Sequence, residues 1–150
     1  MPDHSCPDFV LPATSGTTFS PVNAGKPLVI YFYPKDNTPG CTNESMAFRD
    51  LYPQFQALGA DVVGISRDSL KSHENFKNKF SLPFELASDT EEVACNLFDV
   101  IKMKNMYGKQ VRGIQRSTFV IDGSGQMIRE WRGVKVEGHA AEVLDFVKTL

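Results

Sequence analysis

One cysteine of the sequence stands where a thiol could act as a nucleophile. Cys41 follows a continuous apolar run at 28–33 and a loop at 34–40 that contains two prolines and a glycine. In α/β proteins, ligands tend to bind at the carboxyl ends of strands. A helix beginning near Cys41 would offer free backbone N–H groups and the positive end of its dipole. Gly40 would let the backbone come close to a bound atom without a Cβ clash. The segment therefore predicts a site that favours an anion.

A thiolate at Cys41 needs more than a helix terminus. A free cysteine with a pKa of ~8.5 is only a few per cent thiolate at neutral pH, and the thiolate is the nucleophile. Lowering that pKa by about three units takes ~4 kcal/mol of preferential stabilisation of the anion. A helix terminus supplies at most about 2 kcal/mol. The chain must therefore bring a fixed cation to the cysteine from elsewhere in the sequence.

Strand-like and helix-like segments alternate after residue 27 and would carry this loop. Apolar, β-prone runs predict buried strands, and apolar residues at helical spacing predict helices. Pro53 has no backbone N–H, so we expect a kink or break in the first helix. The predicted order is strand 28–33, helix 41–58, strand 61–66, helix 69–80, strand 84–87, helix 89–98, hairpin 117–132 and helix 140–150. This order predicts one α/β domain over residues 1–150, with a central mixed sheet and a thioredoxin-like layout.

The composition is that of a soluble globular protein. Of the 150 residues, 41% are hydrophobic and 23% are charged, and the formal net charge is −2. Such a charge gives no general attraction to nucleic acid or membrane, and no apolar run reaches the ~18 residues of a membrane span. The N-terminus lacks the basic start and apolar stretch of a signal peptide. We therefore expect a cytoplasmic protein that binds neither nucleic acid nor membrane.

The other cysteines and the histidines show no metal-ligand spacing. Three cysteines, with no CxxC pair, argue against both a disulfide framework and a zinc site. His4, His73 and His139 are scattered, so we expect no metal and no cofactor. Cys41 could pair with His139 in space for hydrolase chemistry, but nothing in the local sequence supports that alternative.

The loop and the cysteine together match a known signature. The pattern Pro34-x-x-x-Thr38-x-x-Cys41 resembles that of the peroxiredoxin family, and the segment 34–44 (PKDNTPGCTNE) is similar to the version in the PrxQ group, the bacterioferritin comigratory proteins. The likeness runs through nearly the whole chain, including Pro7-Asp8-Phe9, Gly64-Ile65-Ser66, the segment 105–109 and the segment 116–119. It implies a thioredoxin-like fold with an N-terminal β-hairpin extension, a monomer, and reduction of hydrogen peroxide and organic hydroperoxides to water and alcohols.

The resemblance also implies roles for the residues of the loop. Cys41 would attack a peroxide oxygen and become a sulfenic acid. Thr38 would offer its hydroxyl to the peroxide and the sulfur, and Pro34 would shield the pocket from water. The backbone N–H groups of Gly40 and Cys41 would stabilise charge on the oxygens as the O–O bond breaks.

Arg116 is the cation that the resemblance implies for this site. Its planar guanidinium keeps its proton and can contact both a thiolate and peroxide oxygens. Glu44 would accept a hydrogen bond from Arg116 and hold it in place. A glutamate in a first helical turn is otherwise an exposed and favourable residue there, so this role competes with a simpler one.

The sequence departs from many PrxQ-type enzymes in its second cysteine. Met46 stands at one usual position of the resolving cysteine, and the helix at 69–80 has no cysteine. Cys95 lies on the predicted helix 89–98, where Val93, Leu97 and Phe98 mark the buried face, and there we expect a core thiol. We also expect packing for Cys6. The prediction is a one-cysteine cycle with an external thiol as reductant, either thioredoxin or glutathione with glutaredoxin. The alternative is a two-cysteine peroxidase in which Cys95 resolves the sulfenic acid.

Two further alternatives concern surfaces rather than the thiol itself. The segment 101–116 holds five lysines and arginines and no acid. We expect a solvated loop beside the site, although such a segment could also attract an anionic reductant or nucleic acid. From a different class, the protein could be a holdase or a redox-signalling binder whose surface changes when Cys41 is oxidised.

Overall fold

The computed structural model describes residues 5–21 and 25–150. In these residues the strands are β1 Leu11–Ala13, β2 Thr17–Phe19, β3 Leu28–Phe32, β4 Asp61–Ser66, β5 Leu86–Ser88, β6 Ile101–Met106, β7 Lys109–Ile114, β8 Ser117–Ile121 and β9 Met127–Arg132. The helices are α1 Pro39–Ala57, α2 Leu70–Phe80, α3 Val93–Leu97 and α4 His139–Val147. This order confirms the predicted alternation, and the β1–β2 pair is the expected N-terminal hairpin.

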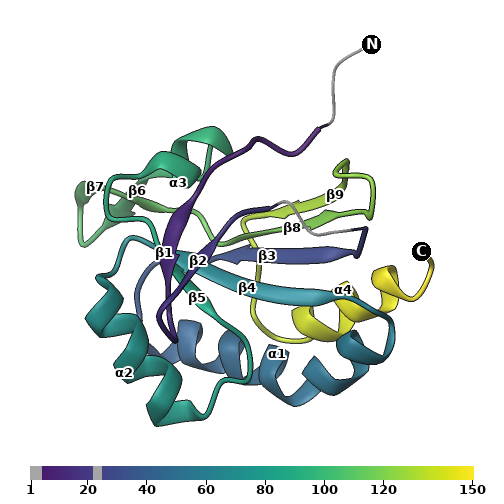
Figure 1. Cartoon of the computed structure of the whole chain (residues 1–150). Helices are drawn as coiled ribbons and strands as arrows, with labels where there is room; N and C mark the ends of the chain where they lie inside the picture. Colours follow the sequence, from purple (N-terminus) through teal and green to yellow (C-terminus); the bar gives the residue numbers. More distant parts are fainter. Residues whose placement is uncertain (1–4, 22–24) are drawn as a thin grey trace.

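A seven-stranded mixed sheet forms the centre of the molecule (Figure 1). Its strand order is β2-β1-β5-β4-β3-β8-β9. The strands β3, β4 and β5 are parallel to one another, and α1 and α2 make the two crossover connections. The strand β8 is antiparallel to β3, with Ser117 opposite Phe32. The first residue of β8 therefore lies beside the last residue of β3, at the edge where parallel strands end.

Helices cover both faces of this sheet. In Figure 1, α1, α2 and α4 lie below it, whereas α3 lies above it. Because side chains alternate across a strand, β3 feeds two separate cores. Val29 and Tyr31 pack with Phe48 of α1 and Val143 of α4. On the opposite face, Ile30 and Phe32 pack with Phe98, Phe119 and Cys95.

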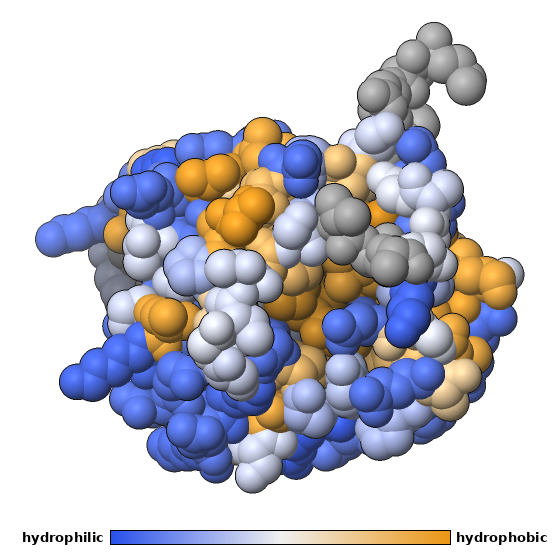
Figure 2. Space-filling model, viewed as in Figure 1, coloured by the Kyte–Doolittle hydropathy of each residue, from blue (hydrophilic) through white to orange (hydrophobic). Residues whose placement is uncertain are grey.

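The helix α2 is buried along one side only. Its N-terminus is capped by Ser69, whose side chain accepts a hydrogen bond from Ser72 N at 3.2 Å. His73 and Phe76 are its buried residues. Figure 2 shows hydrophilic residues gathered over the region of α2, while apolar residues reach the surface higher in the same view. A histidine on the core side of such a helix needs polar partners inside the protein.

Two helices differ from the prediction. The helix α1 begins at Pro39, which needs no hydrogen-bond acceptor in the first turn, and it continues through Pro53 to Ala57 without a break. Burial of Phe48 and Phe55 on either side of the proline holds the helix together. The helix α3 is shorter than 89–98. Val93 and Leu97 are 44% and 47% exposed, so the predicted buried face was wrong for these two residues, whereas Phe98 is buried as predicted.

The segment 101–116 is not a solvated loop. It forms a two-stranded sheet of β6 and β7, joined at Tyr107 and Gly108 with φ angles of 53° and 79°. Two positive φ angles in a row are typical of a tight hairpin turn, and glycine at the second position is favoured there. The prediction missed this hairpin because the lysines and arginines concealed its strand alternation.

Candidate active site

The N-terminus of α1 presents Cys41 from below the sheet edge. Thr38 is the N-cap residue, with φ −94° and ψ 154°, and Cys41 is the third helical residue. The Thr38 hydroxyl makes no cap bond and donates instead to the carbonyl of Lys35 at 2.8 Å. Its lone pairs remain able to accept. Pro34 is half-buried at the start of the same loop. The Cys41 side chain is buried, with 1% of the residue exposed.

Arg116 supplies the cation that Cys41 requires. It directly precedes β8, whose register against β3 carries it to the sheet edge from which the Cys41 loop leaves. Its Nη2 lies 3.5 Å from Sγ of Cys41, within hydrogen-bond distance for sulfur. The guanidinium is mostly buried, with 16% of the side chain exposed. A cation in this position can interact directly with charge that develops on the sulfur.

Glu44 anchors the other side of the guanidinium. Nη1 of Arg116 donates to Oε1 of Glu44 at 2.7 Å. The expectation of an exposed glutamate is wrong, because only 1% of Glu44 is exposed. Burial raises the pKa of its carboxyl from 4.5 to about 7, although Arg116 opposes the shift. Among the described residues, Oε2 has no hydrogen-bond partner. Burial disfavours the charge of Arg116, but Glu44 and Cys41 outweigh it and raise the pKa of the guanidinium.

Gly40 makes room for this guanidinium. A Cβ atom added at residue 40 would lie 3.2 Å from Nη2 of Arg116. The sequence suggested that Gly40 admits a bound atom, and the structure shows that its missing side chain admits the arginine. The structure thus brings Gly40, Cys41, Glu44 and Arg116 together.

A second cation near the site belongs to the basic segment 101–116, which was expected beside the site but as a loop. Lys104 lies on β6, and burial, followed by the charge of Arg116, lowers the pKa of its amine. The neighbouring thiol of Cys41 opposes that shift. Lys104 and Arg67 both flank Gly113 of β7, at 3.8 Å and 3.9 Å from the Cβ position of that glycine. The alternation of residues in 101–106 was the signal that could have revealed this strand.

The remaining cysteines lie apart from this group. All three cysteines are free thiols. Cys41 packs in the core below the sheet, whereas Cys95 is fully buried in the core above it. Burial raises the pKa of the Cys95 thiol far above its ordinary value, and Asp89 raises it further. Cys6 packs against the upper core, as expected, and burial raises its pKa to about 11.

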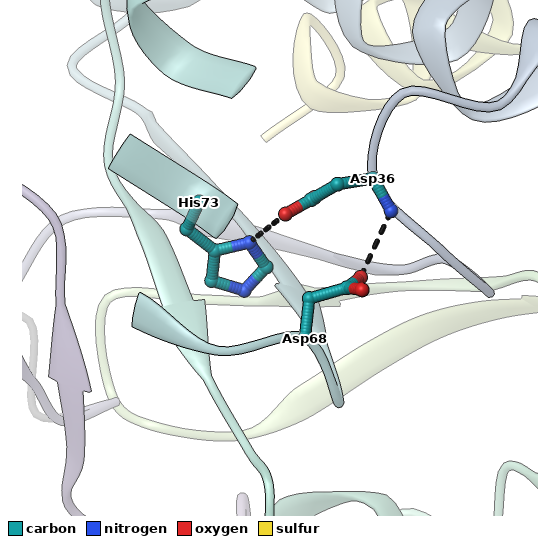
Figure 3. A group of neighbouring side chains, drawn as sticks. All are labelled: Asp36, Asp68 and His73. Atoms are coloured by element: carbon teal, nitrogen blue, oxygen red, sulfur yellow. Dashed lines mark hydrogen bonds and ion pairs between the residues drawn. The ribbon is translucent and has the colours of Figure 1, made fainter. Parts of the chain in front are cut away.

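Of the two described histidines, neither His73 nor His139 has Cys41 as a hydrogen-bond partner. His139 bonds through Nε2 to Oγ1 of Thr118 at 2.8 Å, and burial lowers its pKa to about 4. This partner gives no support to the hydrolase alternative. His73 is buried beside Asp36 and Asp68 (Figure 3). His4 lies outside the described residues.

Comparison with known proteins agrees with this geometry. Residues 2–129 match the model of the AhpC/TSA family. Peroxiredoxin Bcp of Xanthomonas campestris is 54% identical over 94% of this chain and 89% of its own length. Peroxiredoxin Bcp of Bacillus subtilis is 47% identical over 96% of this chain and 92% of its own length. The structure of Xanthomonas campestris peroxiredoxin Q superimposes with a TM-score of 0.89 at 53% identity, covering 94% of this chain and 90% of that one.

The chain therefore belongs to the AhpC/TSA family, with the thioredoxin-like fold of that family and a buried cysteine beside an arginine. Its relatives place it more narrowly among the peroxiredoxins of the Bcp and PrxQ group, which confirms the resemblance drawn from the sequence. It is accordingly a thiol-dependent peroxidase, an enzyme that takes a peroxide substrate and a thiol reductant such as thioredoxin. In the described residues, none of the helices is long and apolar enough to cross a membrane.

Proposed function

We propose that Cys41 is the peroxidatic nucleophile and that it reduces hydrogen peroxide and organic hydroperoxides in a one-cysteine cycle. The observation that carries the proposal is the guanidinium of Arg116, which contacts Sγ of Cys41 at 3.5 Å and Glu44 at 2.7 Å. A solved relative from Xanthomonas campestris, 52% identical, was studied for alkyl peroxide reduction. Its likeness to this chain, with a TM-score of 0.89, supports the same substrate class here.

In the first step the Cys41 thiolate attacks the terminal oxygen of R–O–O–H. An S–O bond forms as the O–O bond breaks, so the sulfur loses two electrons and becomes a sulfenic acid. The alkoxide released takes a proton and leaves as an alcohol, or as water when R is hydrogen. Arg116 and the N–H groups of Gly40 and Cys41 stabilise charge on the oxygens. Thr38 and Pro34 shape the entrance, with the Thr38 oxygen as an acceptor for the peroxide O–H.

An external thiol completes the cycle. It attacks Sγ of the sulfenic acid, releases water and forms a mixed disulfide, and a second thiol frees Cys41. Because Cys41 is 1% exposed, the first turn of α1 must open for this step. The position of Cys95 across the sheet supports an external partner over an internal disulfide. Thioredoxin and glutathione with glutaredoxin are both candidates, and the reducing cytoplasm, which keeps free thiols reduced, is the proposed location. We propose a monomer, following the PrxQ resemblance.

Three variants test the proposal with one assay. Cys41→Ser should lose peroxide consumption with a thiol donor, whereas Cys95→Ser and Cys6→Ser should retain it.

Dimedone should label Cys41 of the peroxide-treated wild type, and non-reducing peptide mapping should show little internal disulfide. Full turnover by Cys41→Ser would refute the nucleophile. A Cys41–Cys95 bridge that is required for turnover would establish the two-cysteine alternative. Client protection by Cys41→Ser without wild-type turnover would favour the binder.

A further inference from the structure

A buried polar cluster links the loop that leads to Cys41 with the helix α2. Figure 3 shows Asp36 of this loop directed toward His73 of α2, with Asp68 beside its backbone. His73 Nδ1 lies 2.7 Å from Oδ2 of Asp36, and the two side chains are 0% and 3% exposed. Tyr33 donates its hydroxyl to Oδ1 of Asp36 at 2.6 Å. Nothing in the proposed reaction uses these groups.

The partners of His73 dictate where its protons lie. Nε2 is 3.0 Å from the carbonyl oxygen of Ala87, which only accepts, so Nε2 carries a hydrogen. Nδ1 faces a carboxylate oxygen of Asp36, which also accepts. Two lone pairs at 2.7 Å repel, so a proton must lie between Nδ1 and Oδ2. The ring and the carboxyl are therefore joined by a shared proton.

A metal ion fits the cluster less well than this proton. The ligand atoms of Asp36, Asp68 and His73 lie within 4.8 Å of one another. A zinc ion bonds such ligands at about 2.0–2.2 Å in a tetrahedron, which holds them roughly 3.3 Å apart rather than in hydrogen-bond contact. The oxygens are also occupied: Oδ2 of Asp68 accepts from the backbone N of Asp36 at 2.8 Å and from Ser66 at 2.6 Å.

These bonds tie both the backbone and the side chain of Asp36 to neighbouring elements of the fold. Its backbone N is bound to Asp68, after β4, and its side chain is bound to His73 and Ser72 of α2. Lys79, also on α2, donates to Oδ1 of Asn37 at 3.1 Å. Thr38, which follows Asn37, is the N-cap of α1 and lies three residues before Cys41. The position of the catalytic turn therefore depends on groups that never meet the peroxide.

We propose that His73 and Asp36 are positioning residues, which hold the loop of residues 34–38 so that Thr38 and Cys41 face the peroxide together. The inference rests on the proposed role of Cys41. Without His73, the buried Asp36 carboxylate loses one of the hydrogen-bond partners of Oδ2. A cavity of about 370 Å³, lined by Asp36, Asn37, Ser69 and Ser72 among others, gives it a route to water. The loop would follow Asp36 into that cavity.

His73→Ala tests the positioning role. Displacement of reacting groups by about 1 Å costs up to ~100-fold in rate, so His73→Ala should react with peroxide roughly 10- to 100-fold more slowly in single-turnover stopped flow. Asp36→Asn should stay within about threefold of wild type. Its amide N–H can donate to Nδ1 of a neutral His73, which restores the bond that the shared proton made. Asp36→Ala should match His73→Ala.

Controls separate positioning from general loss of stability. Val143→Ala weakens the core at α4 but removes no hydrogen bond of the loop, so it should keep its peroxide rate. Lys71→Ala changes an exposed residue of α2 and should also keep it. The inference is overturned if His73→Ala reacts as fast as Val143→Ala at matched stability, or if Asp36→Asn is as slow as Asp36→Ala.

The shared proton gives a second test that needs no activity measurement. Proton NMR of the wild type should show a slowly exchanging Nδ1–H of His73, shifted downfield of ordinary imidazole N–H signals. The signal should vanish in Asp36→Ala. Its absence in the wild type, or its replacement by stoichiometric zinc binding on titration, would overturn the inference. If Cys41→Ser keeps full turnover, the proposed function fails instead, and the NMR signal is unaffected.

Discussion

The missing side chain of Gly40 and the guanidinium of Arg116 fit together: a Cβ at residue 40 would lie only 3.2 Å from Nη2. The same Nη2 contacts Sγ of Cys41. Arg116 cannot retreat freely, because Nη1 is bound to buried Glu44. The distance between thiol and cation therefore depends on a residue that contributes no side chain.

Gly40→Ala should separate activity from stability. Alanine is the better helix former by up to about 1 kcal/mol, which offsets the cost of the tight contact with Nη2, so the free energy of unfolding should change little. The displaced guanidinium stabilises the developing charge less well, so reaction with peroxide should slow by roughly 3- to 10-fold. Stopped-flow oxidation and urea unfolding measure the two effects. In an Arg116→Lys background the alanine should add no further cost, and an additive loss would contradict this account.

The raised pKa of Glu44 predicts a pH dependence of stability. Its pKa is about 7 in the folded protein against 4.5 otherwise, so the folded state binds more protons between these values. Stability should fall as the pH rises from about 4.5 to 7, by an amount on the order of 3 kcal/mol. Glu44→Gln keeps the hydrogen bond to Arg116 and should lack this decline. Urea unfolding of both proteins at pH 5 and pH 8 measures the difference, and parallel curves would argue against ionisation of Glu44.

Ionisation of His139 should give folding stability the opposite pH dependence at acid pH. Burial lowers its pKa from 6.5 to about 4, so the unfolded state binds more protons in that range. Stability should therefore fall as the pH drops from 6.5 toward 4, by at most about 3 kcal/mol. His139→Gln should flatten this acid limb while Thr118 keeps a partner. Thermal unfolding between pH 4 and 7 gives the comparison, with Glu44→Gln as the background that removes the opposing effect.

Cys95 should matter for packing and not for turnover. It is fully buried in the core above the sheet. Cys95→Ala removes a sulfur from that core and should cost about 1 kcal/mol of unfolding free energy. Peroxidase turnover with an external thiol should stay within about twofold, since a distant cavity leaves the reacting groups in place. Chemical unfolding and a coupled peroxidase assay give both values. A collapse of turnover at preserved stability would restore Cys95 as a resolving thiol.

Local features of the sequence were sufficient for the loop and its cysteine. The strand before the loop, the prolines and the glycine, and the start of a helix near Cys41 all follow from neighbouring residues. The family resemblance named the arginine, although no spacing along the chain could place it. Local patterns failed where charge masked alternation, as in the β6–β7 hairpin, and where burial depended on a distant element, as for Val93 and Leu97 of α3.

The sequence by itself determined the chemistry available to this protein: one thiol at a helix start, in a loop whose prolines and glycine set its course. The tertiary structure alone decided its surroundings. Arg116 reaches Cys41 because β8 pairs with β3 in one register, Glu44 is buried beneath it, and Cys95 is separated from Cys41 by the sheet. Dihedral preferences and helix dipoles act over a few residues, whereas strand register and burial are settled only when the whole core packs at once.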